Sequence, residues 1–276
     1  TNPARDHRLR LHIGSDLHGD ELVRDTHWAI LRRPIDPPAS DDWYQQPVRT
    51  HPIRRFAALE EDTRALAVAT RGLPELEVTR HEDGNALLVT LLRAVGWLSR
   101  DDLTSRPQGA GPALETPAAQ LPGPFQAQLA LVPYAPVDPA HRERAIDRFI
   151  APLTALRPVT EPPMAPPLRT QADGGWHLEA PLSLSIVAAP RLDGPLADAA
   201  VGTVLVRIVN PTERAVDGAL RAPVPLRAAT LVRLDQTPLE ELATVGATVH
   251  LHLAPYAVHT LALRLDLPAR KETPHA

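Results

Sequence analysis

The stretch "HEDGNALLVTLL", residues His81–Leu92, is the clearest indication of the fold. Asp83 and Gly84 are residue types that supply the positive φ of a tight β-hairpin turn. The run "ALLVTLL" that follows is apolar at nearly every position, which is typical of a strand buried on both faces. We therefore predict a hairpin whose second strand lies inside a thick β-sandwich.

Short runs of the same kind continue on both sides of this hairpin. They alternate apolar and polar residues or are rich in β-branched ones, and Gly, Pro and Asp separate them. Many short strands at such spacing indicate a sandwich or a barrel. The predicted strands are Arg8–Ile13, Leu22–Arg32, Ile53–Ala58, Ala65–Thr70, Leu76–Arg80, Ala86–Leu92 and Gln126–Val132.

One helix is predicted after these strands. Asp138 suits the N-cap and Pro139 the first turn, and Pro152 ends the helix. The apolar residues that share one face at helical spacing are Ala145, Ile146, Phe149 and Ile150. The Pro-rich stretch at 157–175 that follows predicts a stiff linker of extended, polyproline-like character.

The final hundred residues alternate apolar and polar side chains regularly, which is typical of antiparallel strands with one buried and one solvent-exposed face. The inward-facing sets are Val204, Val206 and Ile208; Val216, Gly218 and Leu220; Val249, Leu251 and Leu253; and Leu261, Leu263 and Leu265. We therefore predict an all-β fold. A large antiparallel β-sandwich spans 1–136, a helix and Pro-rich linker span 137–175, and a small β-sandwich spans 176–276.

Composition excludes several classes of protein. The net charge is −4 with both signs interspersed, so nucleic acid is not an expected partner. No stretch approaches the roughly 20 apolar residues of a membrane span, and no cysteine is present for disulfides or thiolate metal sites. The first residues carry no initiator Met and enter a strand-like run almost at once, so we expect the chain to begin inside a longer protein. We expect a cytoplasmic location, with export left open.

Polar motifs offer few candidates for chemistry. His7, His12, His18 and His27 lie near the start without the spacing of a known metal motif. His250 and His252 share one face of a strand and could share a metal, but solvent exposure of that face is the favoured explanation. The paired acids at 59–62 and 100–102 are as readily explained by solvated loops as by a glycosidase. No phosphate-binding or nucleophile motif is present.

Longer motifs resemble one enzyme family. "TLLRAVGWLSRDDL" (90–103), followed by "AGPALETPAAQLPGPF" (110–125), closely resembles the C-terminal region of bacterial alpha-mannosidases of glycoside hydrolase family 38. The likeness extends to "DHRLRLHI", "DTHWAILRRPIDPP", "THPIRRFAAL" and "RALAVATRGLPELEV", and later to "LVRIVNPTERAV" and "LAPYAVHTLALRL". These segments follow the family's order over essentially the whole chain.

The resemblance implies a part of a retaining, zinc-dependent enzyme that removes terminal alpha-linked mannose. In that family, zinc, the nucleophilic Asp and the acid/base carboxylate belong to an N-terminal catalytic domain. No segment of this chain resembles the zinc motif or the nucleophile region. We therefore expect no catalytic residue, zinc or other cofactor in this chain and no activity alone. Its expected partner is the N-terminal catalytic domain of the same polypeptide, and it meets mannose-containing glycans only through the intact enzyme.

Three residues are singled out as candidates for contact with substrate or sugar. Arg93 ends the apolar run, and in some family members an Arg at the matching strand end points toward the catalytic domain. The alternative is a surface ion pair with Asp101 or Asp102. Trp43 and Tyr44 lie in a polar loop and offer a platform for stacking sugars, as an autonomous carbohydrate-binding module would.

Two alternatives stay open for these surfaces. Because aromatic residues are so few, gap-filling between strands and loops is the favoured explanation for Trp28, Trp43, Tyr44, Trp97 and Trp176. An exposed apolar face that lets the isolated chain self-associate is a third hypothesis. The long loop at 96–125 is expected to follow an extended path across another surface of the enzyme.

Overall fold

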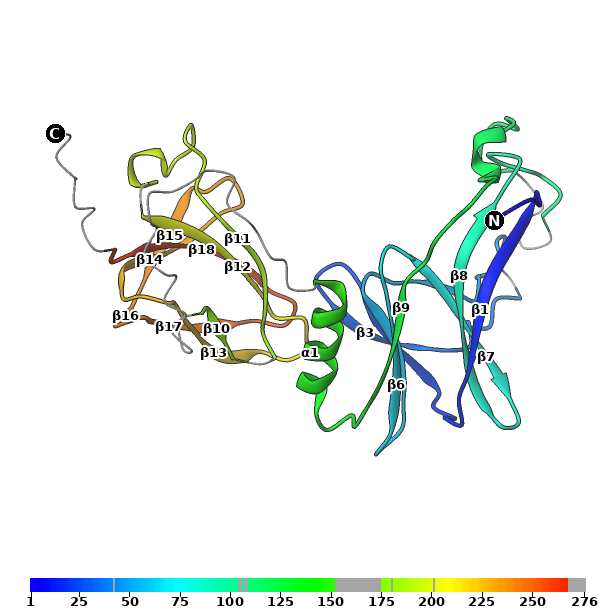
Figure 1. Cartoon of the computed structure of the whole chain (residues 1–276), viewed down its shortest axis with the longest axis horizontal. Coiled ribbons are helices and arrows are strands. Elements are labelled where there is room, and N and C mark those ends of the chain that lie inside the picture. Colours follow the sequence, from blue (N-terminus) through cyan, green and yellow to red (C-terminus); the bar gives the residue numbers. More distant parts are fainter. Residues whose placement is uncertain are drawn as a thin grey trace, which may run out of the picture. The chain divides into compact units, whose positions relative to one another are not determined.

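The structure is a computed structural model of the chain (Figure 1). It describes residues 1–41, 43–103, 106, 109–151, 175–179, 181–200 and 202–267, and of 185–187 only the backbone. The predicted Pro-rich linker at 157–175 lies outside these residues except for Gly175. The chain divides into two compact units, Thr1–Thr154 and Ala155–Ala276, each of which is described by itself.

The first unit contains two antiparallel sheets. One, the β8 sheet, has the strand order β1-β8-β7-β4, and the other, the β5 sheet, has the order β3-β2-β5-β6-β9. The strands are β1 (His7–Gly14), β2 (Glu21–Asp25), β3 (Ile30–Pro34), β4 (Thr50–Pro52), β5 (Phe56–Glu60), β6 (Ala65–Thr70), β7 (Glu75–His81), β8 (Gly84–Ala94) and β9 (Leu129–Tyr134). A short 3-10 helix, η1, spans Pro117–Gln120.

The predicted central hairpin is present, but its turn lies one residue earlier than the predicted Asp83–Gly84 turn. β7 and β8 pair in an antiparallel register that closes at His81 and Gly84, so Glu82 and Asp83 form the two-residue turn. Gly84 has a φ of 129°, and a Cβ at this position would lie 2.2 Å from the carbonyl oxygen of Ser15. Glycine is therefore required by the close approach of the chain at Ser15 as well as by φ. β8 lies between β1 and β7 and is buried on both faces over most of its length.

The prediction of one strand over Leu22–Arg32 is wrong. β2 ends at Asp25, and the chain turns through 26–29 into β3 as a second hairpin. The Thr26 amide donates to the Ala29 carbonyl over 2.8 Å, and Trp28 adopts a positive φ of 66°. A bulky residue at positive φ carries no sequence signal for a turn, which explains the missed break.

The core of the first unit lies between its two sheets. Fully buried Leu22 and Leu59 of the β5 sheet pack against Leu76 and Leu87 of the β8 sheet. Each such leucine contributes roughly 2 kcal/mol of burial free energy. The opposite face of the β5 sheet forms a second core, in which fully buried Ile146 of α1 packs with the strands. The β5 sheet is therefore covered on both faces.

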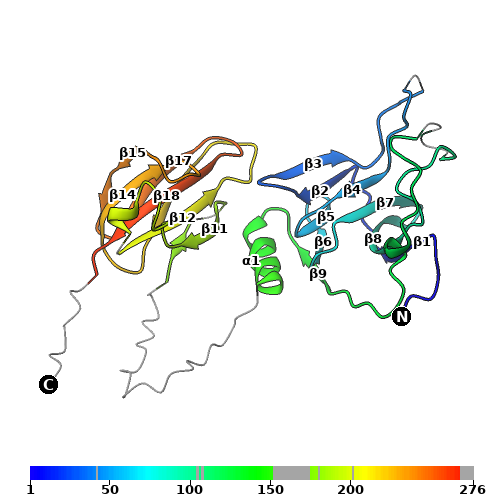
Figure 2. The same ribbon diagram turned by 90° about the horizontal axis from the view of Figure 1, so that it is seen from above.

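Helix α1, Pro139–Ile150, forms as predicted. The Asp138 side chain accepts a hydrogen bond from the His141 amide over 3.0 Å, which caps the helix. α1 lies against β6 and β9 within the first unit (Figure 2). Arg142 is 5% exposed and places its guanidinium over the Phe56 ring, 4.7 Å from its centroid. The helix is thus held by apolar packing and by a buried cation.

The second unit also contains two antiparallel sheets, with the orders β10-β13-β17-β16 and β11-β12-β18-β14-β15. The elements are β10 (His177–Leu178), β11 (Ser183–Ala188), η2 (Ala197–Ala199), β12 (Thr203–Val209), β13 (Val216–Arg221), β14 (Leu226–Val232), β15 (Pro238–Leu242), β16 (Thr244–Val245), β17 (Thr248–Leu253) and β18 (Val258–Leu265). The predicted alternation is confirmed, because Val206, Ile208, Leu253, Leu261 and Leu263 are buried together in one core. The all-β fold class is likewise confirmed for the described residues.

Candidate functional site

Arg93 lies at the end of β8 and is exposed. Its Cα partner in the antiparallel register is Arg8 of β1, so two like charges stand opposite each other. Arg8 is engaged, with Glu75 at 3.3 Å and Glu77 at 3.5 Å. No ion pair of Arg93 occurs within the described part of the chain, and Asp102 instead accepts from Arg100 Nε over 2.7 Å. Arg93 thus presents an uncompensated positive charge at the strand end.

The outer face of the β8 sheet around Arg93 is an ordered ladder of charges. Arg10 Nη1 lies 2.6 Å from Glu77 Oε2, and Thr90 Oγ1 donates to Glu75 Oε1 over 2.8 Å. The stems of long arginine side chains can cover buried apolar residues of this face while their charges stay in water. Such a fixed, polar face is suited to meeting another polar surface rather than to forming a core.

Trp43 and Tyr44 lie in the loop between β3 and β4 and are 53% and 65% exposed. The gap-filling explanation is therefore wrong for these two rings. The loop is braced from inside: the Trp43 amide donates to the Ser40 carbonyl over 2.9 Å, and Gln46 Nε2 donates to the same carbonyl over 2.9 Å. Arg49 Nη1 pairs with Asp36 at the base of the loop over 3.0 Å. A braced loop presents its aromatic rings with less loss of entropy on binding.

The other tryptophans are divided between surface and core. Trp28 and Trp97 are 41% and 40% exposed, whereas Trp176 packs against the core of the second unit. Gap-filling therefore accounts for Trp176.

The long loop after β8 pairs with itself near its start and is tied to the N-terminal segment of the first unit near its end. The Leu98 amide donates to the Leu114 carbonyl over 2.9 Å, and Trp97 forms a β-bridge with Glu115. Gln120 is buried, and its Oε1 accepts from the Asp6 amide over 2.8 Å. Large apolar side chains of this loop are nevertheless exposed, namely Trp97, Leu98, Leu103, Leu114, Leu121 and Phe125. A concentration of exposed apolar residues of this kind marks an interaction surface.

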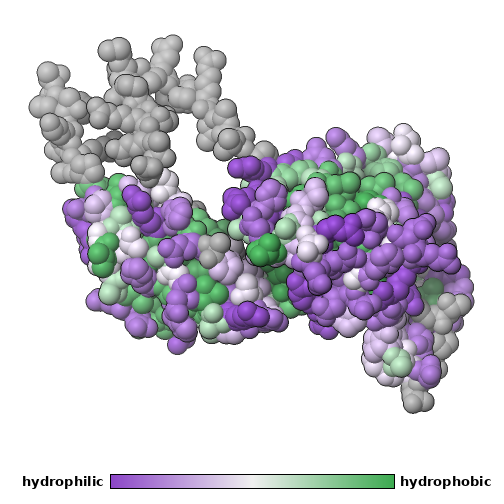
Figure 3. Space-filling model, turned by 90° about the horizontal axis from the view of Figure 1, so that it is seen from below, coloured by the Kyte–Doolittle hydropathy of each residue, from purple (hydrophilic) through white to green (hydrophobic). Residues whose placement is uncertain are grey.

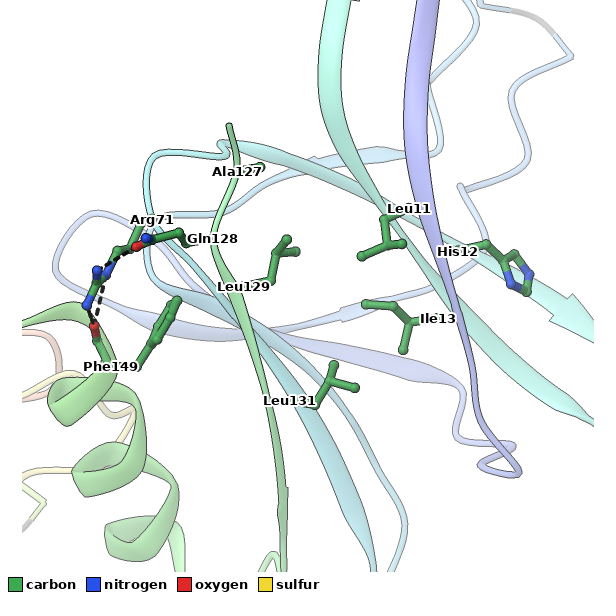
Figure 4. Close-up of a pocket in the computed structure, with 9 residues that line it drawn as sticks. All are labelled: Leu11, His12, Ile13, Arg71, Ala127, Gln128, Leu129, Leu131 and Phe149. Carbon is green, nitrogen blue, oxygen red and sulfur yellow. Dashed lines mark hydrogen bonds between the residues drawn. The ribbon is translucent and has the colours of Figure 1, made fainter. Parts of the chain in front are cut away.

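A groove that the sequence did not reveal lies between the edge strands β1 and β9 (Figure 4). Leu11 and Ile13 of β1 face Leu129 and Leu131 of β9 across it, while His12 points away (Figure 4). The groove has a volume of about 890 Å³. Apolar side chains are also prominent on the face of the first unit seen in Figure 3. The sequences "RLHI" and "LALV" do alternate apolar side chains, as strands that line a groove would. Only the strand pairing shows that β1 and β9 are both edge strands.

One end of this groove is closed by a polar clamp. Arg71 Nη1 donates to Gln128 Oε1 over 2.6 Å, and Arg71 Nε donates to the Phe149 carbonyl over 2.9 Å (Figure 4). The Arg71 guanidinium also lies 4.7 Å from the centroid of the Phe149 ring. The clamp ties the end of α1 to the loop before β9.

The histidines do not assemble a metal site. Among the described residues, no three His, Cys, Asp or Glu side chains lie together as metal ligands would. His250 and His252 do share a face of β17, as predicted, but His252 Nδ1 is paired with Asp217 Oδ1 at 2.7 Å, and both side chains are largely exposed. His12 instead packs edge-on against His81. These residues do not fit a resident zinc ion.

The fold and its surfaces define a protein of two β-sandwich units, with an arginine-rich sheet face and a braced aromatic loop in the first. No family model matches the chain. Two solved structures share its fold. One is an alpha-mannosidase from Enterococcus faecalis V583, with a TM-score of 0.68 and 22% identity over 94% of this chain. The other, from the same species, is a protein of glycosyl hydrolase family 38, with a TM-score of 0.67 and 21% identity over 95% of this chain.

A curated protein from Halalkalibacterium halodurans, named "Putative mannosylglycerate hydrolase", is 32% identical over 133 residues, which are 48% of this chain. The chain spans only 13% of that protein and 26% and 27% of the two solved structures. Nearly all of this chain therefore has the fold of one part of a family 38 alpha-mannosidase. In the described residues, no helix is long and apolar enough to cross a membrane.

Proposed function

We propose that the chain is a non-catalytic β-sandwich portion of an alpha-mannosidase-type glycoside hydrolase, which packs on the catalytic domain and completes it. The observation that carries this proposal is the fold likeness over 94% of the chain to about a quarter of a family 38 alpha-mannosidase. The family resemblance of the sequence supports the same assignment.

The chemistry of the described side chains favours a structural role for this chain over a catalytic one. Retaining hydrolysis needs two carboxyl groups about 5 Å apart across the scissile bond. The buried carboxylates Asp25 and Glu60 instead form ion pairs with arginines within the first unit. In our proposal, the zinc ion and both catalytic carboxylates belong to the catalytic domain. Zinc there would position sugar hydroxyls and polarise the substrate.

Two surfaces of the first unit suit the proposed packing. The described part of the loop at 96–125 exposes large apolar side chains, and the loop is tied to the first unit near its end. Arg93, at the end of β8, has no ion pair with a described residue, and its planar guanidinium suits a carboxylate or the hydroxyls of a sugar. We therefore propose that Arg93 faces the substrate region in the intact enzyme.

The proposal is tested by assaying this chain and the intact enzyme side by side. The chain alone, with added zinc, should give no turnover of an aryl alpha-mannoside above the zinc-only rate. Co-expression with the catalytic domain should yield a one-to-one complex that hydrolyses the substrate. Turnover by the chain alone that disappears on mutating one of its residues would show that the chain carries its own active site.

A second candidate function is carbohydrate binding by this chain alone. The exposure of Trp43 and Tyr44 favours it, because aromatic faces in a braced loop are suited to stacking against sugar rings. Titration with mannose or manno-oligosaccharides should then show millimolar or tighter binding that Trp43→Ala abolishes. Phe149→Ala, which alters an aromatic ring at the groove, is the matched control. Equal binding by wild type and Trp43→Ala would remove this candidate.

A further inference from the structure

Strands β2, β3 and β4 direct three basic side chains into the space between the two sheets of the first unit. Arg24 lies two residues from fully buried Leu22 on β2, and Arg33 of β3 is the Cα partner of Leu22. His51 of β4 is the Cα partner of Leu76, which is also fully buried. Paired residues, and residues two apart on a strand, point to the same face. The three basic side chains therefore lie on the same side of their strands as the core, with Arg24 buried, His51 partly buried and Arg33 exposed at the rim.

The side chain of Arg24 spans the gap between the two sheets. β3 and β4 are edge strands of different sheets, and Arg24 Nη1 donates to the Pro52 carbonyl of β4 over 2.7 Å. This contact places the guanidinium between the two edges. The loop that carries Trp43 and Tyr44 runs from β3 to β4, so the basic cluster lies at the base of that loop.

Two polar atoms of the cluster are buried without a partner. Arg24 is only 8% exposed, and its Nε has no hydrogen bond to any residue that the structure describes. His51 Nε2 is buried and unbonded in the same way. A buried donor or acceptor normally finds a partner, because leaving it unmade costs about 1–3 kcal/mol. The Arg24 Nε–H thus makes no hydrogen bond to a described residue, and because the atom is buried, an anion reaches it only when neighbouring side chains shift.

Among the described residues, no carboxylate compensates this cluster through an ion pair, although the charge of Glu77 acts on His51. The nearby acids are engaged elsewhere: Glu77 with Arg10 at 2.6 Å, and Asp36 with Arg49 and Arg80. No ion pair of Arg24 or Arg33 occurs between described residues. Burial, and then the charge of Arg33, lower the pKa of Arg24 below its ordinary value. Burial, followed by the charges of Arg24 and Arg33, likewise lowers the pKa of His51. The site thus has an excess of positive charge.

We propose that Arg24, Arg33 and His51 bind a small carboxylate anion at the base of the loop between β3 and β4. The Nε edge of Arg24 is a planar pair of donors, which matches the two oxygens of a carboxylate. His51 Nε2 supplies a third donor when it carries a proton. Arg33 is exposed and adds positive charge on the side from which the anion arrives. The proposal concerns residues of this chain alone and does not rest on the proposed mannosidase role.

The test is an NMR titration of the 276-residue chain with glycerate at constant ionic strength. Glycerol serves as the neutral analogue and inorganic phosphate as the competing oxyanion. We expect saturable shifts of the Arg24 Nε–H and His51 ring signals with glycerate, weaker shifts with phosphate and none with glycerol. These two signals report on the site itself rather than on general salt effects.

Three variants make the titration decisive. Arg24→Lys keeps the charge but removes the planar edge, and should weaken glycerate binding about tenfold or more. Arg33→Gln removes an exposed charge and should weaken it about two- to fivefold. Arg54→Gln, an exposed arginine that precedes β5, should leave it unchanged. If Arg24→Lys fails to fold, the Arg24 Nε–H signal and Arg33→Gln still decide the outcome.

The proposal is overturned by any of four results. These are no saturable binding of glycerate, equal binding of glycerol, tighter binding of phosphate than of glycerate, and glycerate binding that Arg24→Lys and Arg33→Gln leave unchanged.

Discussion

Arg55 and Asp25 form an ion pair beneath helix α1, with Arg55 Nε 2.7 Å from Asp25 Oδ2 and the Asp25 side chain only 4% exposed. Arg55 also reaches the helix itself, through Glu143 Oε2 at 2.9 Å and Asp147 Oδ1 at 2.8 Å. Glu143 and Asp147 are four residues apart and therefore lie on one helix face. One arginine thus joins the end of β2 to the helix that covers the β5 sheet.

Replacing this arginine should destabilise the first unit strongly. Arg55→Gln leaves Asp25 buried without its counter-charge, which typically costs about 3–5 kcal/mol. Urea unfolding followed by circular dichroism measures the loss. Arg54→Gln, an exposed neighbour that leaves the pair intact, should change stability by no more than about 0.5 kcal/mol. Similar losses of unfolding free energy in both variants would show that the Arg55–Asp25 pair does not stabilise the fold more than an exposed arginine does.

The cost of Arg55→Gln should also depend on pH. Burial raises the pKa of the Asp25 carboxyl above its ordinary value of 3.8, and the charge of Arg55 lowers it only in part. Without Arg55 the folded-state pKa rises further. A carboxyl with a raised folded pKa stabilises the fold below its unfolded pKa, and this contribution is lost as pH rises through the folded pKa. The difference between wild type and Arg55→Gln should therefore be smaller at pH 4 than at pH 7. A constant difference would contradict this reasoning.

Gly84 gives a sharper test of the hairpin. Gly84→Ala places a Cβ 2.2 Å from the Ser15 carbonyl at a φ of 129°, so the chain must shift or strain. We expect a loss of at least about 2 kcal/mol in the free energy of unfolding. Gly72→Ala, at a φ of 75° with open space around it, is the matched control and should cost about 1 kcal/mol. Equal costs would mean that φ alone, and not the contact with Ser15, requires glycine.

Local signals in the sequence were sufficient for the elements that carry their own pattern. The β7–β8 hairpin, the apolar β8 and the capped helix at Asp138 are all specified by neighbours in the chain. The break at Trp28 was missed because its turn uses a backbone conformation that tryptophan rarely adopts. Pairing between distant strands was also invisible, so neither the groove between β1 and β9 nor the cluster at Arg24 had a sequence signal.

Site prediction was limited for a related reason. The scarcity of aromatic residues favoured gap-filling for Trp43, yet its ring is exposed. The sequence around a strand-end arginine such as Arg93 is the same whether the side chain binds a ligand, a carboxylate or water. Its register partner, Arg8, comes from a strand about 80 residues away and could not be assigned from sequence alone. The functional assignment of Arg93 therefore stays a prediction.

The motif "NPT", which begins at Asn210 and belongs to the family resemblance, is explained by the hydrogen bonds of the Asn210 side chain. Asn210 is fully buried; its side chain donates to the carbonyls of Arg214, Leu253 and Ala254 and accepts from Thr212. Asn210→Ala leaves several of these groups unpaired and should destabilise the second unit by about 2–4 kcal/mol. Amide hydrogen exchange should accelerate in β12 and β18 and not in β5 and β6. Exposed Glu213→Ala should change neither, and faster exchange throughout the chain would contradict a local role.

Arg93 provides the test of how this chain contributes to catalysis in an intact mannosidase, if the proposed function holds. Arg93 is exposed and has no ion pair among the described residues, so its removal should barely change the melting temperature. If it contacts substrate or a catalytic carboxylate, Arg93→Ala in the full-length enzyme should lower kcat/KM at least tenfold, which corresponds to about 1.4 kcal/mol of transition-state stabilisation. Arg227→Ala, which breaks an exposed ion pair with Asp266 in the second unit, is the control and should leave kcat/KM unchanged. Unchanged kinetics for Arg93→Ala, or a loss that follows unfolding, would place Arg93 among the ordinary surface charges.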